Sequence, residues 1–437
     1  MVLRAAGILP WRDRAALTAW RDRRIVACVA HAAARVPYYR GLYRDLGGAI
    51  GDVRGLDDLA ALPLTDKAAL RAQPEAALLA DRARPRSLRR LQTTGSSGVP
   101  FVLYRSTAES WRLQAYWARA HQALGHRLGE RIVRILAMRR APLPDGRGLR
   151  RLLRAGGLKT TDLDATELPA ALLARLATLR PAVIGGYPGM LAQLGEELAA
   201  AGAGRPAPRL LIAGGEVMTP ARRRQIERSW GAPVREVYGC WEAGLLAWQC
   251  RATGLFHLCE DSVAVEILRD GRPVPEGERG ELVLTALHCR TMPLIRYRLG
   301  DVVTRGPAPC PCGLPFATVA AIQGRMLDFF RLPSGRLLHP YELLVRLQEE
   351  GWVSRYRLVQ ERQDLIRIDL VPGPHFAPER LAAFQRRAAA VLRGEARLEA
   401  RLVETIESAA GGKFHLARSL VEPPDSAADW HRSAPVG

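Results

Sequence analysis

The sequence predicts an α/β protein with a large N-terminal unit containing mixed sheets and a small α+β unit at the C-terminal end. Its 437 residues exceed the size at which one hydrophobic core usually stops growing. Between residues 166 and 238, short apolar runs alternate with helix-like segments, as in a mainly parallel sheet. A second, smaller series of strand and helix patterns begins at residue 324. We therefore expect one domain over residues 1–323, a mobile C-terminal domain over 324–421 and a disordered tail over 422–437.

The composition is that of a soluble globular protein, with 48% hydrophobic and 25% charged residues. No apolar run reaches the roughly 18 residues that a membrane-spanning helix needs. The first residues, Met1 to Trp11, contain no apolar core of signal-peptide length. We therefore expect a cytoplasmic protein without a membrane partner.

The formal net charge of +20 raises the question of nucleic-acid binding. Only three of the 64 basic residues are lysines, namely Lys67, Lys159 and Lys413, and the arginines are scattered along the whole chain. Net charge by itself informs about solubility and non-specific association rather than about activity. We do not expect a nucleic-acid partner, although the Arg-rich segment 82–90 could serve as a docking surface.

The N-terminal third reads as helices followed by two strands. Residues 12–45 place apolar side chains at helical spacing, with a break at Pro37 to Tyr39. Short helices are expected over 57–82. Strands are expected at 101–104 and 132–136.

The middle of the chain carries the α/β alternation. Helices are expected at 166–179, 189–201 and 220–230, and strands at 182–184, 210–213 and 234–238. Two of these strands run into glycine-rich segments, 185–188 and 214–216. Parallel sheets bind their ligands at such strand ends.

After residue 255 the pattern changes to antiparallel strands. Runs at 263–268 and 280–284 are joined through a hairpin-type turn at 270–272. The smaller C-terminal unit then shows two strands, a helix and a third strand, near 356–360, 365–370, 377–392 and 397–403.

Thr93 to Pro100 is a cluster of small and hydroxylated residues, Thr-Thr-Gly-Ser-Ser-Gly-Val-Pro. Small residues let backbone amides approach an anion, and the hydroxyls can donate to phosphate oxygens. No Gly-Lys-Ser/Thr follows, so the segment is not a Walker loop. A flexible surface turn is the alternative interpretation, since such clusters are primarily loop signals.

Two further segments place a carboxylate after a strand. Tyr238 to Glu242 offers Glu242, and an oxygen donor beside a phosphate loop suits Mg²⁺. Tyr297 to Asp301 offers Asp301, which could accept from both ribose hydroxyls. Taken alone, the first is equally an ordinary strand–turn–helix junction, and the second a surface turn.

In order and spacing, these segments resemble the adenylate-forming superfamily, in the branch of phenylacetate–CoA ligases and CapK-like proteins. The resemblance covers nearly the whole chain. It rests on eight segments in the same order: 35–39, 62–67, 93–100, 214–216, 238–242, 297–301, 324–325 and 411–413.

The resemblance implies a phosphate and magnesium site. Thr94, Ser96 and Ser97, together with Thr93, would hold the β- and γ-phosphates of ATP. Glu242 would bind Mg²⁺.

The resemblance also implies a nucleoside site. Its residues would be Gly215, Glu216, Tyr238, Gly239, Asp301 and Arg325. Tyr238 would stack on adenine in a pocket that Gly215 and Glu216 line, and Asp301 would hold the ribose hydroxyls with help from Arg325.

Lys413, after Gly411-Gly412, matches the catalytic lysine of the family. In-line attack of a carboxylate on the α-phosphorus gathers negative charge, and an ammonium aimed there stabilises the transition state. A chain that uses arginine almost everywhere retains lysine here, as a compact point charge on a flexible stem.

Two residues depart from the family pattern. Trp241 stands where the motif usually has threonine, so one hydroxyl near the phosphates is missing. Leu327 stands where the hinge usually has aspartate, with Asp328 next. The domain rotation between half-reactions could therefore use a different pivot.

Seven cysteines and no secretory signal argue against a disulfide framework. Cys250, His257, Cys310 and Cys312 resemble the set that holds a structural zinc in some members of this branch. Thiolates and imidazole suit tetrahedral Zn²⁺ with no open position. Cys259 could replace one ligand, and reduced core cysteines with a surface histidine are the alternative.

The resemblance implies an ATP-dependent ligase that converts a small aromatic carboxylic acid to an acyl-adenylate and transfers the acyl group to CoA. An amine, a carrier-protein thiol or a hydroxyl is the alternative acceptor. A binding protein that kept the fold without catalysis is a third hypothesis, which the retained Glu242, Asp301 and Lys413 disfavour. The sequence leaves open whether the protein forms a homodimer. It also leaves open which residues line the acid pocket, for which the candidates are Trp111, Tyr116, Trp117, His121 and Tyr187.

Overall fold

The computed structural model of the chain describes most of the 437 residues. Described are residues 11, 13–81, 83, 85–93, 101–136, 159–165, 167–200, 206–325, 330–338, 340, 343, 352–373, 375–406 and 417–421. The predicted disordered tail, 422–437, lies outside them, as does Leu327.

Helices form the N-terminal part. They are α2 (Arg14–Arg35), α3 (Pro37–Leu42), α4 (Ala49–Asp52), α5 (Lys67–Arg71) and α6 (Glu75–Leu78), with short 3-10 turns at Arg44–Leu46, Asp57–Ala61 and Pro85–Ser87. Asp13 caps α2 by accepting from the backbone N–H of Ala15. Pro37, predicted to break the helical run, is the first residue of α3. None of the described helices is long and apolar enough to cross a membrane.

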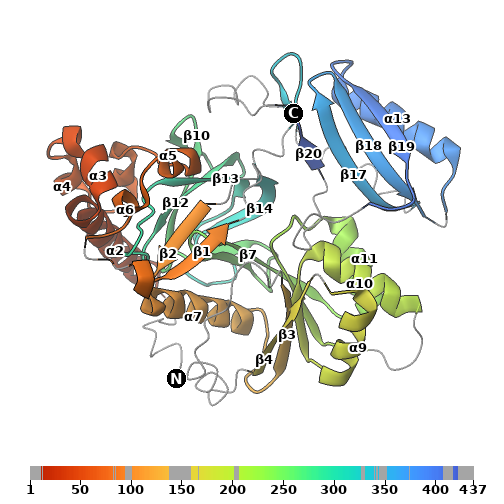
Figure 1. Ribbon diagram of the computed structural model, residues 1–437, viewed down its shortest axis with the longest axis horizontal. Helices are drawn as coiled ribbons and strands as arrows, with labels where there is room; N and C mark the ends of the chain where they lie inside the picture. Colours follow the sequence, from red (N-terminus) through yellow and green to blue (C-terminus); the bar gives the residue numbers. More distant parts are fainter. Residues whose placement is uncertain are drawn as a thin grey trace.

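One twelve-stranded sheet forms the centre of the molecule (Figure 1). Its strands lie in the order β11-β10-β12-β13-β14-β9-β8-β7-β6-β5-β3-β4. A separate hairpin pairs β1 (Arg89–Thr93) with β2 (Phe101–Arg105).

The parallel half of this sheet contains β3 (Arg131–Leu136), β4 (Lys159–Asp164), β5 (Val183–Gly186), β6 (Leu210–Ala213) and β7 (Val234–Cys240). The four residues of β5 and the four of β6 are all buried, as expected for short apolar strands covered on both faces. The helices that connect and cover this half are α9 (Pro169–Leu179), α10 (Pro188–Ala200) and α11 (Pro220–Trp230). Helix α7 (Thr107–Ala123) lies beside the sheet and begins with a capping box between Ser106 and Glu109.

The antiparallel half begins at β7, which is parallel to β6 and antiparallel to β8 (Gly244–Gln249). It continues through β9 (Phe256–Leu258), β10 (Val263–Arg269), β11 (Arg272–Pro273), β12 (Arg279–Ala286), β13 (Tyr297–Arg305) and β14 (Thr318–Arg325). The predicted turn after 268 is confirmed, because Asp270 and Gly271 have positive φ angles of 53° and 73°.

The C-terminal part has a second sheet with a core of its own. Strands β17 (Val353–Arg362), β18 (Leu365–Pro372), β19 (Arg397–Leu402) and β20 (Ala417–Ser419) lie in the order β19-β18-β17-β20. Helix α13 (Pro378–Leu392) packs Phe384, Ala388 and Leu392 into that core. A two-stranded ribbon of β15 (Phe330–Arg331) and β16 (Leu337–Leu338) precedes the sheet. The predicted fold class, α/β with a smaller α+β unit, is confirmed.

Candidate active site

The loops after the parallel strands meet at one edge of the large sheet. Gly186 of β5 pairs with Ala213 of β6, and the Gly214 backbone N–H donates to the Gly186 carbonyl at 3.2 Å. Gly215 has φ of +82°, and a Cβ added there would lie 3.0 Å from the ring of Tyr187. Only glycine allows this close approach, so the loop after β6 lies directly against the loop after β5.

Glu216 connects this edge to helix α10. Its Oε2 accepts from the backbone N–H of Gly189 at 2.8 Å, in the first turn of the helix. A carboxylate there satisfies an otherwise unpaired helix N–H and complements the helix dipole. The loop that the resemblance assigns to the adenine side is thus held in place by its own acidic residue.

Tyr238 and Asp301 join the two halves of the sheet. The Tyr238 hydroxyl donates to Asp301 Oδ2 at 2.5 Å, although 63 residues separate them in the chain. Asp301 is buried and pairs with Arg325 across β13 and β14. A Cβ added at Gly324 would lie 2.9 Å from Val217 Cγ2, so the end of β14 contacts the loop after β6. Four segments far apart in the sequence therefore converge here.

Glu242 lies in the turn after β7. Its carboxylate is 3% exposed and lies 3.9 Å from the Lys67 ammonium, measured from Oε1 to Nζ. The Lys67 Nζ also lies 6.0 Å from the centre of the Phe101 ring, at the start of β2. A buried carboxylate offers the hard oxygen donors that Mg²⁺ prefers, so Glu242 fits the predicted ligand.

Lys67 has no assigned role in the sequence interpretation, although its segment is among the matching ones. Thr65 forms a parallel bridge with Tyr297, and its carbonyl accepts from the Arg298 N–H at 2.8 Å. Asp66 then caps α5. The rarity of lysine in this chain was the signal that could have identified Lys67.

Several predicted residues are placed only in part. Thr93 ends β1 and pairs with Phe101 of β2, so the hairpin flanks residues 94–100 on both sides. Thr94, Ser96, Ser97 and Lys413 lie outside the described residues. Gly239 is described in β7, where an added Cβ would lie 2.7 Å from the Trp117 ring.

The aromatic candidates for the acid pocket separate into two groups. Tyr116 is 1% exposed and donates to the Asp261 carbonyl at 2.7 Å, so it belongs to the core. Trp117 and Tyr187 lie against Gly239 and Gly215 of the site loops. His121 contacts Trp117 edge to face, and burial, with a contribution from the Arg134 charge, lowers its pKa to about 3.

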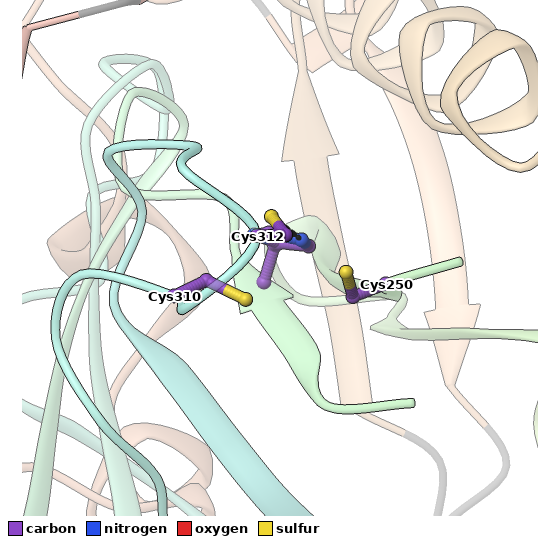
Figure 2. A group of neighbouring side chains, drawn as sticks. Cys250, Cys310 and Cys312 are labelled. Carbon is purple, nitrogen blue, oxygen red and sulfur yellow. Dashed lines mark hydrogen bonds between the residues drawn. The ribbon is translucent and has the colours of Figure 1, made fainter. Parts of the chain in front are cut away.

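A second cluster lies in the antiparallel half. The ligand atoms of Cys250, His257, Cys310 and Cys312 all lie within 4.8 Å of one another. Figure 2 shows the three cysteines around one point, with Cys250 directly after β8 and the other two on the loop between β13 and β14. Cys312 Sγ is 3.6 Å from His257 Nε2.

The surroundings of the cluster suit a metal. Tight turns carry the cysteines, since Gly254 donates to the Cys250 carbonyl at 3.0 Å and Gly313 to the Cys310 carbonyl at 3.1 Å. Burial lowers the pKa of His257 to about 4, which keeps its imidazole neutral, and Nδ1 has no hydrogen-bond partner among the described residues. Cys259 is not part of the cluster, because its Sγ contacts Arg119 at 3.1 Å.

Comparisons with known proteins agree with the geometry. No protein-family model matches the chain. The phenylacetate-coenzyme A ligase of Thermus thermophilus is 28% identical over 362 residues, which are 80% of this chain and 79% of the relative.

Among solved structures, 2-hydroxyisobutyryl-CoA ligase in the postadenylation state, in complex with 2-HIB-AMP, matches with a TM-score of 0.77 at 21% identity. The match covers 92% of this chain and 89% of that chain. The same ligase in the thioesterification state, in complex with 2-HIB-AMP and CoA, matches with a TM-score of 0.61 at 21% identity, covering 92% and 90%. The resemblance drawn from the motifs is thereby confirmed, and the fold is that of the adenylate-forming ligases.

Proposed function

We propose that this chain, a relative of the phenylacetate–CoA ligases, is an ATP-dependent acid–CoA ligase that forms AMP. It would convert a small aromatic carboxylic acid to an acyl-adenylate and then transfer the acyl group to CoA. The observation that carries the proposal is the convergence of Gly215, Tyr238, Asp301 and Arg325 at the carboxyl edge of the parallel strands. The curated relative from Thermus thermophilus, aligned over most of both chains, supports the same activity.

The nucleoside would bind where the two halves of the sheet meet. Asp301 would accept hydrogen bonds from the ribose hydroxyls, while its other contact, from the Tyr238 hydroxyl, fixes the carboxylate. The Tyr238 ring would stack on adenine, between Gly215 and Gly239. Glu216, occupied with the N-terminus of α10, would shape this pocket through its backbone.

The phosphates would lie between the β1–β2 hairpin and the turn after β7. Thr93, Thr94, Ser96 and Ser97 would donate to phosphate oxygens, and Glu242 would bind Mg²⁺, which would neutralise charge on the leaving pyrophosphate. Lys67 would supply the cation that the phosphate loop itself lacks. The distance of 3.9 Å from its ammonium to the Glu242 carboxylate supports this role.

Lys413 would supply a second positive charge to the reaction. Its ammonium would lie between the substrate carboxylate and the α-phosphate, where charge develops during attack. We propose that residues 324–421 move relative to residues 1–323 to deliver Lys413 and then open a path for the acceptor. The different TM-scores against two states of one ligase, 0.77 and 0.61, support such a rearrangement.

The Cys250–His257–Cys310–Cys312 cluster would hold a structural Zn²⁺. Four nitrogen and sulfur donors within 4.8 Å fill a tetrahedral shell and leave no position for substrate. The ion would connect the end of β8 to the loop before β14, the strand that carries Arg325. Metal analysis of protein purified without added zinc tests this role, and about one equivalent is expected.

The acceptor is the less constrained part of the proposal. Trp241 replaces the usual threonine and is 42% exposed beside the phosphate site. Because of this change, we retain an amine, a carrier-protein thiol or a hydroxyl as the alternative acceptor of the acyl group in place of CoA. Mass spectrometry of reactions with ATP, a panel of aromatic acids and CoA decides between them: a CoA thioester is expected, and a stable acyl-adenylate that CoA does not consume would favour the alternative.

We also propose a cytoplasmic location and a homodimer. Light scattering after size-exclusion chromatography tests the dimer by its mass of about twice 48.0 kDa. A monomer at assay concentration would remove the dimer without affecting the proposed chemistry.

A further inference from the structure

Arg105 lies directly behind the turn that presents Glu242. It is the last residue of β2 and is 7% exposed. Its Nη2 donates to the Glu242 carbonyl at 2.7 Å and also to the Trp241 carbonyl. One guanidinium nitrogen therefore bridges two successive carbonyls of the turn after β7.

The charge of Arg105 has an unusual environment for a buried guanidinium. Buried charges normally pair with an opposite charge. Within the described part of the chain, no ion pair includes Arg105, whereas Arg119, Arg296 and other buried arginines pair with carboxylates. Cys289 lies beside the Arg105 side chain. Burial raises the pKa of the Cys289 thiol, and the positive charge of Arg105 offsets part of this rise.

Trp241 explains why this turn needs support from its backbone. The residue stands where the family motif usually has threonine, and the indole offers no hydroxyl to anchor the turn. Its side chain is 42% exposed, so packing does not hold it either. The contacts of Arg105 with the carbonyls of Trp241 and Glu242 do not depend on the side chain at 241.

We propose that Arg105 is a positioning residue that fixes the Trp241–Glu242 turn and so holds the Glu242 carboxylate toward Lys67. The inference rests on the proposed function only in assigning Mg²⁺–ATP to Glu242. Arg105 thus joins the end of β2, which begins at Phe101, to the turn that carries Glu242.

A purely structural role makes a different prediction from a positioning role. If Arg105 only adds stability, its loss lowers the melting temperature and the fraction of folded enzyme, with unchanged Mg²⁺ dependence. If it positions Glu242, its loss raises the Mg²⁺ concentration needed for half-maximal activity in the molecules that remain folded. Lysine at this position keeps the charge and N–H donors, but its flexible stem does not hold the ammonium in a fixed direction as the planar guanidinium holds Nη2.

The test compares Arg105→Met, Arg105→Lys and a matched control, Arg223→Met. Arg223 donates to the Val234 carbonyl at 2.7 Å, at the start of β7, and also pairs with Glu236, away from the proposed site. Each variant is measured for acid-dependent pyrophosphate release against Mg²⁺ concentration, for melting temperature, and for hydrogen exchange of residues 240–244.

Arg105→Met is expected to raise the half-saturating Mg²⁺ concentration about tenfold, consistent with loss of a charge-assisted hydrogen bond. Exchange at 240–244 should rise, Arg105→Lys should recover part of both effects, and Trp241→Thr in the Arg105→Met background should recover Mg²⁺ affinity. Arg223→Met should lower the melting temperature alone. Equal Mg²⁺ dependence and equal exchange in wild type and Arg105→Met would overturn the inference.

Failure of the proposed function gives a separate result. If wild type releases no pyrophosphate with any acid, calorimetry of ATP binding with and without Mg²⁺ replaces the activity readout. A Mg²⁺-dependent gain in ATP affinity that Arg105→Met loses and Arg223→Met keeps still supports the positioning role. The same gain in all three proteins contradicts it.

Discussion

The two halves of the twelve-stranded sheet differ in their loops and in their buried charged residues. In the parallel half, β5 and β6 are short, wholly buried and followed by glycine-rich loops that lie against each other. In the antiparallel half, buried carboxylates pair with arginines, as in Arg119–Asp261 and Arg296–Glu266. We propose that the first half supplies the binding edge and that the second supplies a frame held by buried ion pairs.

The candidate site lies where the two halves meet. Tyr238 belongs to the last parallel strand, and Asp301 and Arg325 belong to antiparallel strands. The hydrogen bond from Tyr238 to Asp301 crosses that boundary. We therefore expect substitutions on either side of this boundary to affect ATP binding. Substitutions in the buried ion pairs of the antiparallel half should affect only the free energy of unfolding.

The largest expected effect separates binding from chemistry. Lys413→Ala should lower the rate of acyl-adenylate formation by at least roughly 100- to 1,000-fold, the scale of losing one group that stabilises transition-state charge. ATP binding should remain, because the boundary residues are intact. Pre-steady-state formation of acyl-AMP and calorimetry of ATP binding measure the two quantities. Unchanged adenylation in this variant would remove Lys413 from the mechanism.

The next effect belongs to the frame. Asp261 accepts from Arg119 and from the indole N–H of Trp11, and the Arg119 guanidinium lies 5.1 Å from the Trp248 ring centre. Asp261→Asn leaves a buried guanidinium without its counter-charge, which typically costs about 3–5 kcal/mol of unfolding free energy. Denaturant unfolding measures the loss, and the KM for ATP should not change.

Asp364→Asn is the matched control for that prediction. Asp364 pairs with Arg362 on the surface, where both side chains are more than half exposed. Such exposed pairs contribute little to the free energy of unfolding, because water and salt screen them. A loss of equal size in the two variants would contradict the distinction between frame and surface.

A third effect tests the boundary itself. Asp301→Asn should raise the KM for ATP by roughly 10- to 100-fold, since a hydrogen bond to a charged group contributes about 1.5–3 kcal/mol. Tyr238→Phe, which removes only the hydroxyl that orients Asp301, should have a smaller effect in the same direction. Steady-state kinetics at saturating acid measures both, and a normal KM in Asp301→Asn would place the ribose elsewhere.

Removal of the proposed zinc ion tests whether the cysteine cluster stabilises the antiparallel half. Cys312→Ser should abolish zinc binding and lower the melting temperature by several degrees, because a structural ion contributes directly to folding. Cys259→Ser, outside the cluster, should keep the full metal content. A chelator should lower the melting temperature of wild type but not of Cys312→Ser. Full zinc content in Cys312→Ser would contradict the proposed ligand set.

The smallest effect is a pH dependence of the frame. Burial lowers the pKa of His288 to about 4, and its ring contacts the Tyr116 hydroxyl at 2.9 Å. The unfolded chain binds a proton near pH 6.5 that the folded chain does not take up until about pH 4. Stability should therefore be constant above pH 6.5 and fall between pH 6.5 and 4. His288→Gln should reduce the size of this fall but not abolish it, because burial also lowers the pKa of His121, which stays in the variant.

Sequence reasoning identified the binding edge better than the frame. The alternation of apolar runs and helices predicted β5, β6 and β7, and the glycines after β5 and β6 predicted the loops, whereas the parallel strand β4 was missed. Strand β8 was missed because its apolar run from Leu245 to Trp248 shows no alternation, and β9 was missed because it has only three residues. The ion pair of Arg119 with Asp261 joins positions 142 residues apart, which no local pattern encodes.

The candidate site also contains contacts that no local sequence pattern predicts. Motifs named Tyr238, Glu242 and Asp301, but periodicity alone could not bring Lys67 to Glu242, because the contact depends on the bridge from Thr65 to Tyr297. The structure brings together the four residues that the sequence grouped as metal ligands, and Cys259 is separated from them by its contact with Arg119.

The central claim is ATP-dependent activation of an acid at the boundary between the halves. Acid-dependent exchange of labelled pyrophosphate into ATP, without CoA, tests it most directly in wild type and Asp301→Asn. The proposed function predicts exchange with at least one aromatic carboxylic acid in wild type and strongly reduced exchange in the variant. No exchange with any acid, in protein that binds ATP with Mg²⁺, would contradict it.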